Sequence, residues 1–166
     1  SEQGLLKRFS GENDIATSYM KVSAYDEINN NVPDVDGKIV VFLHDFYDSP
    51  HVYGEMIFSD FWEWITFTVE AMLELNLPFV IKPHPTQIDL SDHVIGKLID
   101  KYPDMTIISS NVTNKQLALE GGMSCAVTVY GTVAHEMAYF GVPSIACARH
   151  PHISFDFCKT AKNKNE

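Results

Sequence analysis

Basic residues are scarce in this sequence of 166 residues: 12 Lys and Arg stand against 22 Asp and Glu, and the formal net charge is −10. A protein that binds nucleic acid through its phosphates needs a positive surface field. Nucleic-acid binding of that sequence-independent kind is therefore excluded. An anionic ligand would have to be held by a few local groups.

Long hydrophobic runs are also missing. The longest, such as residues 39–43 and 78–81, fall far short of the roughly 20 residues that a membrane-spanning helix needs. The polar start at residues 1–4 does not resemble a signal peptide. We therefore expect no transmembrane segment in this chain.

Cysteine is rare, and the other composition figures are those of a globular protein. Apolar residues make up 45% and aromatic residues 11%, with 9 Gly and 8 Pro, which excludes collagen-like, low-complexity and disordered classes. The three cysteines are odd in number and lack the spacing of metal ligands: Cys125, Cys147 and Cys158. The first two lie in apolar runs, where buried thiols are common. A reducing, cytoplasmic location fits best.

Apolar runs alternate with amphipathic stretches beyond residue 38. Strands are expected at residues 38–43, 78–82, 105–108, 124–130 and 143–147, and helices at 59–76, 91–102, 114–119 and 132–140. Parallel strands joined by helices need right-handed crossovers, which place helices on both faces of the sheet. The sequence predicts an α/β fold: a doubly wound, Rossmann-like parallel sheet of about five strands.

The chain divides into three segments by composition. Residues 1–37 form a polar leader with a weakly helical stretch at 16–28, and residues 38–151 form the Rossmann-like domain. Residues 152–166 are a charged tail that we expect to be truncated.

Four of the seven histidines follow predicted strands: His44, His84, His150 and His152, the last two beside Arg149. Ligands of open parallel sheets bind outside the carboxyl ends of the strands. The four histidines are therefore expected to share the edge where a ligand would bind, although any one of them alone is better explained as a solvated or capping loop residue.

His84 stands in the sharpest local motif, Lys82-Pro83-His84-Pro85. The two prolines fix φ and restrict the residues before them, so they hold the imidazole in a stiff, extended turn. Such an imidazole can donate to a phosphate oxygen or protonate a leaving group, and Lys82 adds positive charge. The alternative is that the prolines merely end a strand.

A second motif, residues 130–136, joins a predicted strand to a helix. Gly131 permits close backbone approach and Thr132 is a good N-cap, so the free N–H groups of the helix could hold a phosphate. Glu136 lies one turn further on, where a carboxylate could accept hydrogen bonds from ribose hydroxyls. The alternative is an ordinary capped helix with a solvated glutamate.

Other site chemistries are disfavoured. The sequence contains no P-loop and no G-x-G-x-x-G fingerprint, and residues 135–139 lack the second histidine of a zinc protease helix. A metal site built from the four histidines is disfavoured because Lys82 and Arg149 suit an anion better than a cation. We expect no cofactor and no metal.

Residues 80–85, followed by residues 130–143, resemble the nucleotide-sugar-binding, C-terminal domain of GT-B glycosyltransferases, in particular those of bacterial capsule and surface-polysaccharide biosynthesis. The similarity covers residues 38–151. In that family a His-Pro motif and a Ser/Thr-rich turn contact the donor phosphate, and an acidic residue one turn later contacts the ribose. His84, Thr132 and Glu136 match those roles by position. Here Tyr130-Gly131-Thr132 stands where many relatives carry a run of serines.

The resemblance implies a nucleotide-sugar donor as substrate and no required metal. The expected donor-binding residues are His44, Lys82, His84, Pro85, Tyr130, Gly131, Thr132 and Glu136. No catalytic residue is assigned, and His84 is the best candidate. Because GT-B enzymes have two such domains, a glycan or glycolipid acceptor and full activity are expected to need a missing N-terminal domain, with the full-length protein peripheral at the inner membrane.

Two other functions remain open at this stage. Sugar-nucleotide epimerases and transferases of polyol phosphate from a CDP-activated donor share similar edge motifs, and the nucleotide base and reaction product would separate them. A non-catalytic interaction module of the same fold would instead use exposed aromatic residues between 46 and 64 and would bind no nucleotide. We expect most of these aromatics to pack in the core: Phe46, Tyr47, Tyr53, Phe58, Phe61, Trp62 and Trp64.

Overall fold

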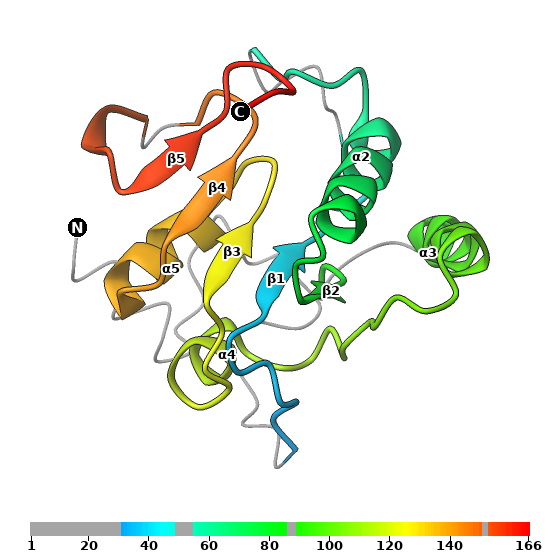
Figure 1. Cartoon of the computed structure of the whole chain (residues 1–166), viewed down its shortest axis with the longest axis horizontal. Coiled ribbons are helices and arrows are strands. Elements are labelled where there is room, and N and C mark those ends of the chain that lie inside the picture. Colours follow the sequence, from blue (N-terminus) through cyan, green and yellow to red (C-terminus); the bar gives the residue numbers. More distant parts are fainter. Residues whose placement is uncertain (1–30, 49–54, 86–88, 151–152) are drawn as a thin grey trace.

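The computed structural model describes residues 31–48, 55–85, 89–150 and 153–166. Within them the chain forms a five-stranded sheet in which every pairing is parallel. The strands are β1 (Ile39–Phe42), β2 (Phe79–Lys82), β3 (Cys125–Val127), β4 (Ser144–Ala146) and β5 (Cys158–Thr160). The helices are α2 (Phe61–Glu74), α3 (Asp89–Lys101), α4 (Asn114–Leu119), α5 (Val133–Phe140) and the short 3₁₀ helix η3 (Ile153–Phe155). Figure 1 shows the strands side by side with helices packed around them.

The strand order identifies the point where the chain reverses direction across the sheet. The order is β2-β1-β3-β4-β5, and Ile107 pairs with Ile81 on the side of β2 away from β1. The first half of the chain therefore adds strands on one side of β1, first β2 and then the bridge at Ile107. The second half adds β3, β4 and β5 on the other side of β1. This is the doubly wound arrangement, and its switch point lies between β1 and β3.

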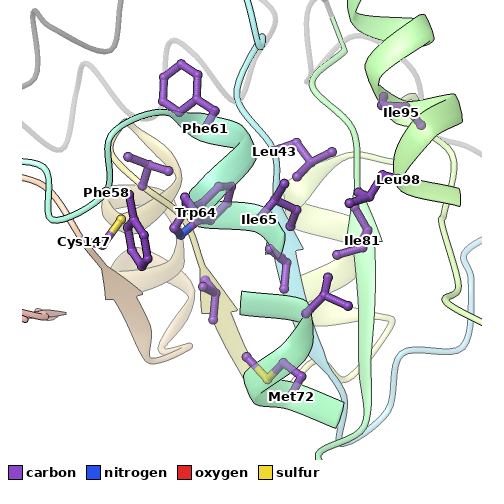
Figure 2. Packing of buried hydrophobic residues seen from close by; sticks show 14 of the residues in the cluster. Leu43, Phe58, Phe61, Trp64, Ile65, Met72, Ile81, Ile95, Leu98 and Cys147 are labelled. Atoms are coloured by element: carbon purple, nitrogen blue, oxygen red, sulfur yellow. The ribbon is translucent and has the colours of Figure 1, made fainter. Parts of the chain in front are cut away.

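Helices cover both faces of the sheet. On one face α2 and α3 pack against alternate strand residues such as Val41 and Ile81, and Figure 2 shows Trp64 and Ile65 of α2 inserted there. On the other face α4 and α5 cover the intervening residues, including Val40 and Val80. Each large apolar side chain buried in this way contributes about 1.5–3 kcal/mol to folding. The predicted α/β doubly wound class is confirmed.

Local sequence signals place several helix ends. Asp60 caps α2 by accepting a hydrogen bond from the Glu63 amide at 2.7 Å, which satisfies one of the free amides of the first turn. Gly141 ends α5 with φ of 76°, a left-handed conformation that glycine adopts without a steric penalty. The helix predicted at residues 114–119 is observed with those bounds.

The predicted and observed strands differ at the two edges of the sheet. Residues 105–108 were predicted as a full strand, but only Ile107 forms a bridge. The chain instead gains β5, within residues 152–166, for which the sequence predicts no element. A strand of three residues that contains Lys159 is typical of a sheet edge, where a charged side chain discourages pairing with a further strand. Such a short strand shows almost no hydrophobic pattern in the sequence, so it was not predicted.

The aromatic residues between β1 and α2 mostly pack inward, as predicted. Phe58, Phe61 and Trp64 are buried, and Phe46 and Trp62 pack partly buried against the same cluster. Tyr47 differs, with 54% of its surface exposed. Tyr53, the leader helix at 16–28 and the histidine at 152 lie outside the described residues. No helix within the described ranges is long and apolar enough to cross a membrane.

Candidate functional site

The carboxyl edge of the sheet collects most of the predicted site residues. His44 follows β1, His84 follows β2, Tyr130 and Gly131 follow β3, and His150 follows β4. Since β1 and β3 flank the switch point, the groups that follow them stand where ligands of doubly wound sheets bind.

His44 is fixed by contacts on two sides. Its ring stacks on Phe61 at a centroid distance of 5.3 Å and an interplanar angle of 8°, and its Nε2 hydrogen-bonds the Tyr130 carbonyl oxygen. Because a carbonyl only accepts, Nε2 carries the proton, and Nδ1 is the acceptor nitrogen of the neutral ring. Burial lowers the pKa of His44, against smaller raising effects of the Tyr130 carbonyl and Asp48. His44 is therefore a neutral imidazole that bridges the two strands of the switch point.

Gly131 lies against this ring. Its φ is +124°, which L side chains rarely adopt, and a Cβ built on it would stand 3.6 Å from Cε1 of His44. The glycine thus lets the backbone turn sharply from β3 toward α5.

His84 lies within electrostatic reach of His44. The pKa of His84 is lowered to about 4: burial is the largest cause, His44 and Lys82 lower the pKa as well, and the charges of Asp45 and Asp48 oppose the shift. The imidazole is half-buried between Pro83 and Pro85, in the stiff turn that the sequence predicts. At neutral pH this His44–His84 pair is uncharged, and the N–H of His44 donates to the Tyr130 carbonyl.

Lys82 occupies a different place from the one its sequence position suggests. Only 2% of it is exposed. Its ammonium group donates to the Ser110 carbonyl oxygen at 3.1 Å and lies 5.9 Å from the centre of the Phe42 ring. Burial lowers the pKa of Lys82 to about 8, and the charge of Glu136 opposes that shift. Lys82 is therefore a buried positive charge beneath the carboxyl edge of the sheet, and its ammonium group is not exposed on the surface of that edge.

Glu136 is likewise buried, with 1% exposed. Its Oε2 accepts a hydrogen bond from Nδ2 of Asn114 at 2.6 Å. The sequence left two possibilities for this residue, a ribose ligand or a solvated side chain, and the structure shows a carboxylate enclosed among protein groups. Its contact with a ribose stays a prediction.

Thr132 stands at the N-cap position of α5 without using its side chain as a cap. Its backbone is helical, with φ of −71° and ψ of −19°, and the residue is exposed. The hydroxyl is on the surface at the start of α5, the end of the helix that attracts negative charge.

His150 and Arg149 lie further along the same edge. Nε2 of His150 and the hydroxyl of Thr160 in β5 are 2.8 Å apart, and burial and the charge of His135 lower the pKa of His150. Arg149 is exposed and lies 3.9 Å from Glu55. Arg149 lines a cavity of about 560 Å³, and His150 contacts Thr160, which lines the same cavity. The lining residues are Glu55, Ile57, Arg149, Ile153, Asp156, Cys158, Lys159, Thr160, Ala161 and Lys162. The structure thus separates these residues from the His44–His84 pair by β3.

Two residues of the edge were not singled out from the sequence. Ser91 of α3 is buried and donates to Oδ1 of Asp45 at 2.7 Å, which ties the loop after β1 to the start of α3. Asn114 follows the capping residue Thr113 and reads as an ordinary first helical residue. Neither carries a sequence signal, because each acquires its role from a partner on a distant element.

Among residues 31–48, 55–85, 89–150 and 153–166, no group of three or more His, Cys, Asp or Glu could hold a metal ion. The cysteines there are free thiols, of which Cys147 and Cys158 are buried.

No family model and no curated protein matches this sequence. Among solved structures, the chain is similar to KpsC of Thermosulfurimonas dismutans, a beta Kdo 2,4 transferase, with a TM-score of 0.55 and 11% sequence identity. The match covers 84% of this chain and 42% of that chain, so this chain spans less than half the length of KpsC. A likeness at this identity shows a shared parallel α/β fold.

Proposed function

We propose that this chain is the donor-binding domain of a GT-B glycosyltransferase that acts in surface or capsular polysaccharide biosynthesis. The observation that carries the proposal is the place of His44, which donates to the Tyr130 carbonyl at the switch point between β1 and β3, with His84 at the end of the neighbouring strand within electrostatic reach of it. The His-Pro and strand-to-helix motifs support it. So does the fold shared with KpsC, whose name describes a beta Kdo 2,4 transferase.

The donor phosphate would be held by neutral hydrogen-bond donors and one buried charge. His84, the Thr132 hydroxyl and the amides of the first turn of α5 are the donors. Lys82 supplies positive charge from beneath. Fixed donors of this kind stabilise the leaving phosphate as it gains charge, so the proposal includes no divalent cation.

His84 is the best candidate for a catalytic group. A phosphate close to the imidazole would favour its protonated form and raise its pKa above the value of about 4. The protonated ring could then donate to the leaving phosphate oxygen as the glycosidic bond to it breaks. The acceptor, a glycan or glycolipid, would be bound by a further domain, because the match spans 42% of KpsC.

Isothermal titration of the chain with CMP, CDP, UDP, GDP and dTDP, with and without EDTA, tests the proposal. We expect one nucleotide to bind in EDTA, with affinity at least tenfold lower in His84→Ala, a loss of about 1.4 kcal/mol. Lys101→Ala is the control, since this exposed cation lies in the last turn of α3 and pairs with Glu70 of α2, not with a residue of the proposed site. The control should bind as the wild type does.

The alternatives give different results. Binding of CDP followed by transfer of a polyol phosphate, or epimerisation of a sugar nucleotide, would identify one of the related enzymes. If no nucleotide binds to a folded sample, the donor-binding proposal for this chain is wrong and the interaction-module hypothesis is favoured.

A further inference from the structure

The cavity at the carboxyl ends of β4 and β5 lies apart from the residues assigned to the donor. Its volume of about 560 Å³ falls within the range of roughly 300–1,000 Å³ that is typical of small-molecule sites. Its lining comes from the segment before α2, from Arg149 after β4 and from the stretch between residues 153 and 162. Figure 1 shows the C-terminal loop beyond the tips of β4 and β5. Ligands of parallel sheets bind at this edge.

Backbone and side-chain contacts hold the lining segments in place. The Ile57 amide donates to the Cys147 carbonyl at 3.2 Å, which ties the segment before α2 to the end of β4. The Ala161 amide donates to a carbonyl of β4 at 2.9 Å and continues the pairing of β5. Beyond it, the Lys164 ammonium group pairs with Glu63 in the first turn of α2. The cavity is therefore formed before any ligand binds, as small-molecule sites usually are.

Cations outnumber carboxylates around this cavity, although the net charge of the whole chain is −10. The cations are Arg149, Lys159 and Lys162, and the carboxylates are Glu55 and Asp156. In an acidic protein, a local excess of positive charge attracts an anion to that place.

The ion pairs of the cavity leave donors for a ligand. Arg149 lies 3.9 Å from Glu55, and Lys159 lies 3.9 Å from Asp156, which is longer than a hydrogen bond. Within the described ranges, the ammonium group of Lys162 has no ion pair or hydrogen bond, and only its amide is used. Exposed pairs of this kind contribute little to stability. A ligand oxyanion can therefore replace either carboxylate at small cost.

Both carboxylates stand on backbone in the left-handed region. The φ of Glu55 is 59° and that of Asp156 is 52°, and Asn76 is the one other non-glycine residue with positive φ in the described part of the chain. Such conformations are uncommon for L residues and gather at binding sites. Their occurrence at two positions of one cavity points to a ligand there.

A neutral hydrogen-bonding group completes the lining. Thr160 lines the cavity, and its hydroxyl lies 2.8 Å from Nε2 of His150. Because only 3% of His150 is exposed, the ring holds this hydroxyl in a fixed place.

We propose that this cavity is a second anion-binding site, which takes the phosphate or carboxylate group of a small molecule. Arg149 is its main contact, and Lys159 and Lys162 lie beside it. The planar guanidinium matches either oxyanion with two parallel hydrogen bonds. The inference does not rest on the proposed function, since none of the residues assigned to the donor lines the cavity.

Amide NMR of the isotope-labelled chain, titrated with inorganic phosphate and separately with malonate, tests the proposal. Sodium chloride at equal ionic strength serves as the reference. We expect saturable shifts of the amides of residues 158–162, and an affinity about tenfold lower in Arg149→Gln, the loss of one charge-assisted hydrogen bond. Lys97→Gln is the matched control, because it removes an exposed cation of α3 that does not line the cavity.

The two probes distinguish the possible ligands. Tighter binding of phosphate assigns the site to a phosphoryl group, and tighter binding of malonate assigns it to a carboxylate. Glu55→Gln removes a competing acid and should tighten binding by up to about fivefold. The proposal is overturned if neither probe shifts residues 158–162, or if Arg149→Gln and Lys97→Gln bind equally well.

The same spectra separate this site from the donor site. Shifts confined to His84 and residues 131–133 would support anion binding at the donor site and overturn the second site. Shifts at residues 158–162 in a chain that binds no nucleotide would leave the second site standing and the donor site rejected. If Arg149→Gln does not fold, Lys162→Gln takes its place, and unchanged affinity in that variant overturns the proposal.

Discussion

The Nε2–H of His44 donates to the carbonyl oxygen of Tyr130, and this bond joins the loop after β1 to the turn after β3. The two strands are neighbours in the sheet, but among the described residues no backbone hydrogen bond joins the loops that follow them. The His44 ring, stacked on Phe61, therefore holds these two loops together at the switch point.

His44→Phe should destabilise the protein by about 0.5–1.5 kcal/mol, because it keeps a ring against Phe61 but removes one of the two hydrogen bonds to the Tyr130 carbonyl, leaving the one from the Thr128 hydroxyl at 3.2 Å. Urea unfolding measures the loss. His44→Gln, which retains an N–H donor, should recover part of the stability. Equal losses in the two variants would show that the ring and not the hydrogen bond matters.

Stability should fall as pH falls from about 6.5 to about 4, partly because of His84. Its pKa is about 4 in the folded chain and near 6.5 in the unfolded chain. Within that window the unfolded state binds more protons, so acid favours unfolding, and the stability is complete above the upper limit. The effect is at most ~3 kcal/mol for a shift of this size.

Urea unfolding of the wild type and His84→Asn across this range checks the prediction. Asparagine does not titrate, so the variant should lose less stability between pH 6.5 and 5 than the wild type does. Parallel curves of stability against pH would mean that the pKa of His84 is the same in the folded and the unfolded protein, which would contradict the prediction.

Cys147 should be unreactive in the folded protein. It is buried, and burial raises its pKa to about 12, so almost no thiolate forms at pH 8. A thiol reagent such as DTNB should modify Cys125, which is half-buried, before Cys147. Mass spectrometry of the partly modified protein identifies the order, and rapid modification of Cys147 under native conditions would contradict the burial shown here.

Most of the fold follows from the alternation of apolar runs with amphipathic stretches. The helix at residues 114–119 and the strand that ends at Lys82 could be predicted because the spacing of their apolar residues is visible in the local sequence. β5 was missed because its three residues, of which Lys159 faces outward at an edge, hold almost no apolar pattern. The segment at 105–108 has a strand-like sequence, but pairs through Ile107 alone.

The candidate site was only partly predictable for a different reason. The positions of His44 and His84 at one edge could be predicted, because each follows a predicted strand. Pro83 and Pro85 on either side of His84 also single it out in the sequence. The burial of Lys82 and Glu136 does not, since it depends on how α4 and α5 pack over the end of β2. Asn114 gives no signal of its own, because its contact with Glu136 joins residues 22 apart in the chain.

Gly131→Ala should weaken both the fold and the donor site. A Cβ there has room, with His44 Cε1 at 3.6 Å, so the cost comes from the φ of +124°. A non-glycine residue forced into such a region costs on the order of 1–3 kcal/mol, and relief of the strain would move Tyr130 and Thr132. We expect a lower urea midpoint together with a loss of nucleotide affinity.

Gly96→Ala is the matched control for that variant. Gly96 lies inside α3, its φ is not positive, and a Cβ there would meet nothing within 4 Å. Because alanine favours a helix by up to about 1 kcal/mol over glycine, the control should gain stability and bind nucleotide unchanged. If Gly131→Ala behaved like Gly96→Ala, the turn after β3 would not need its left-handed backbone, and the anion-binding geometry proposed for residues 130–132 would lose its basis.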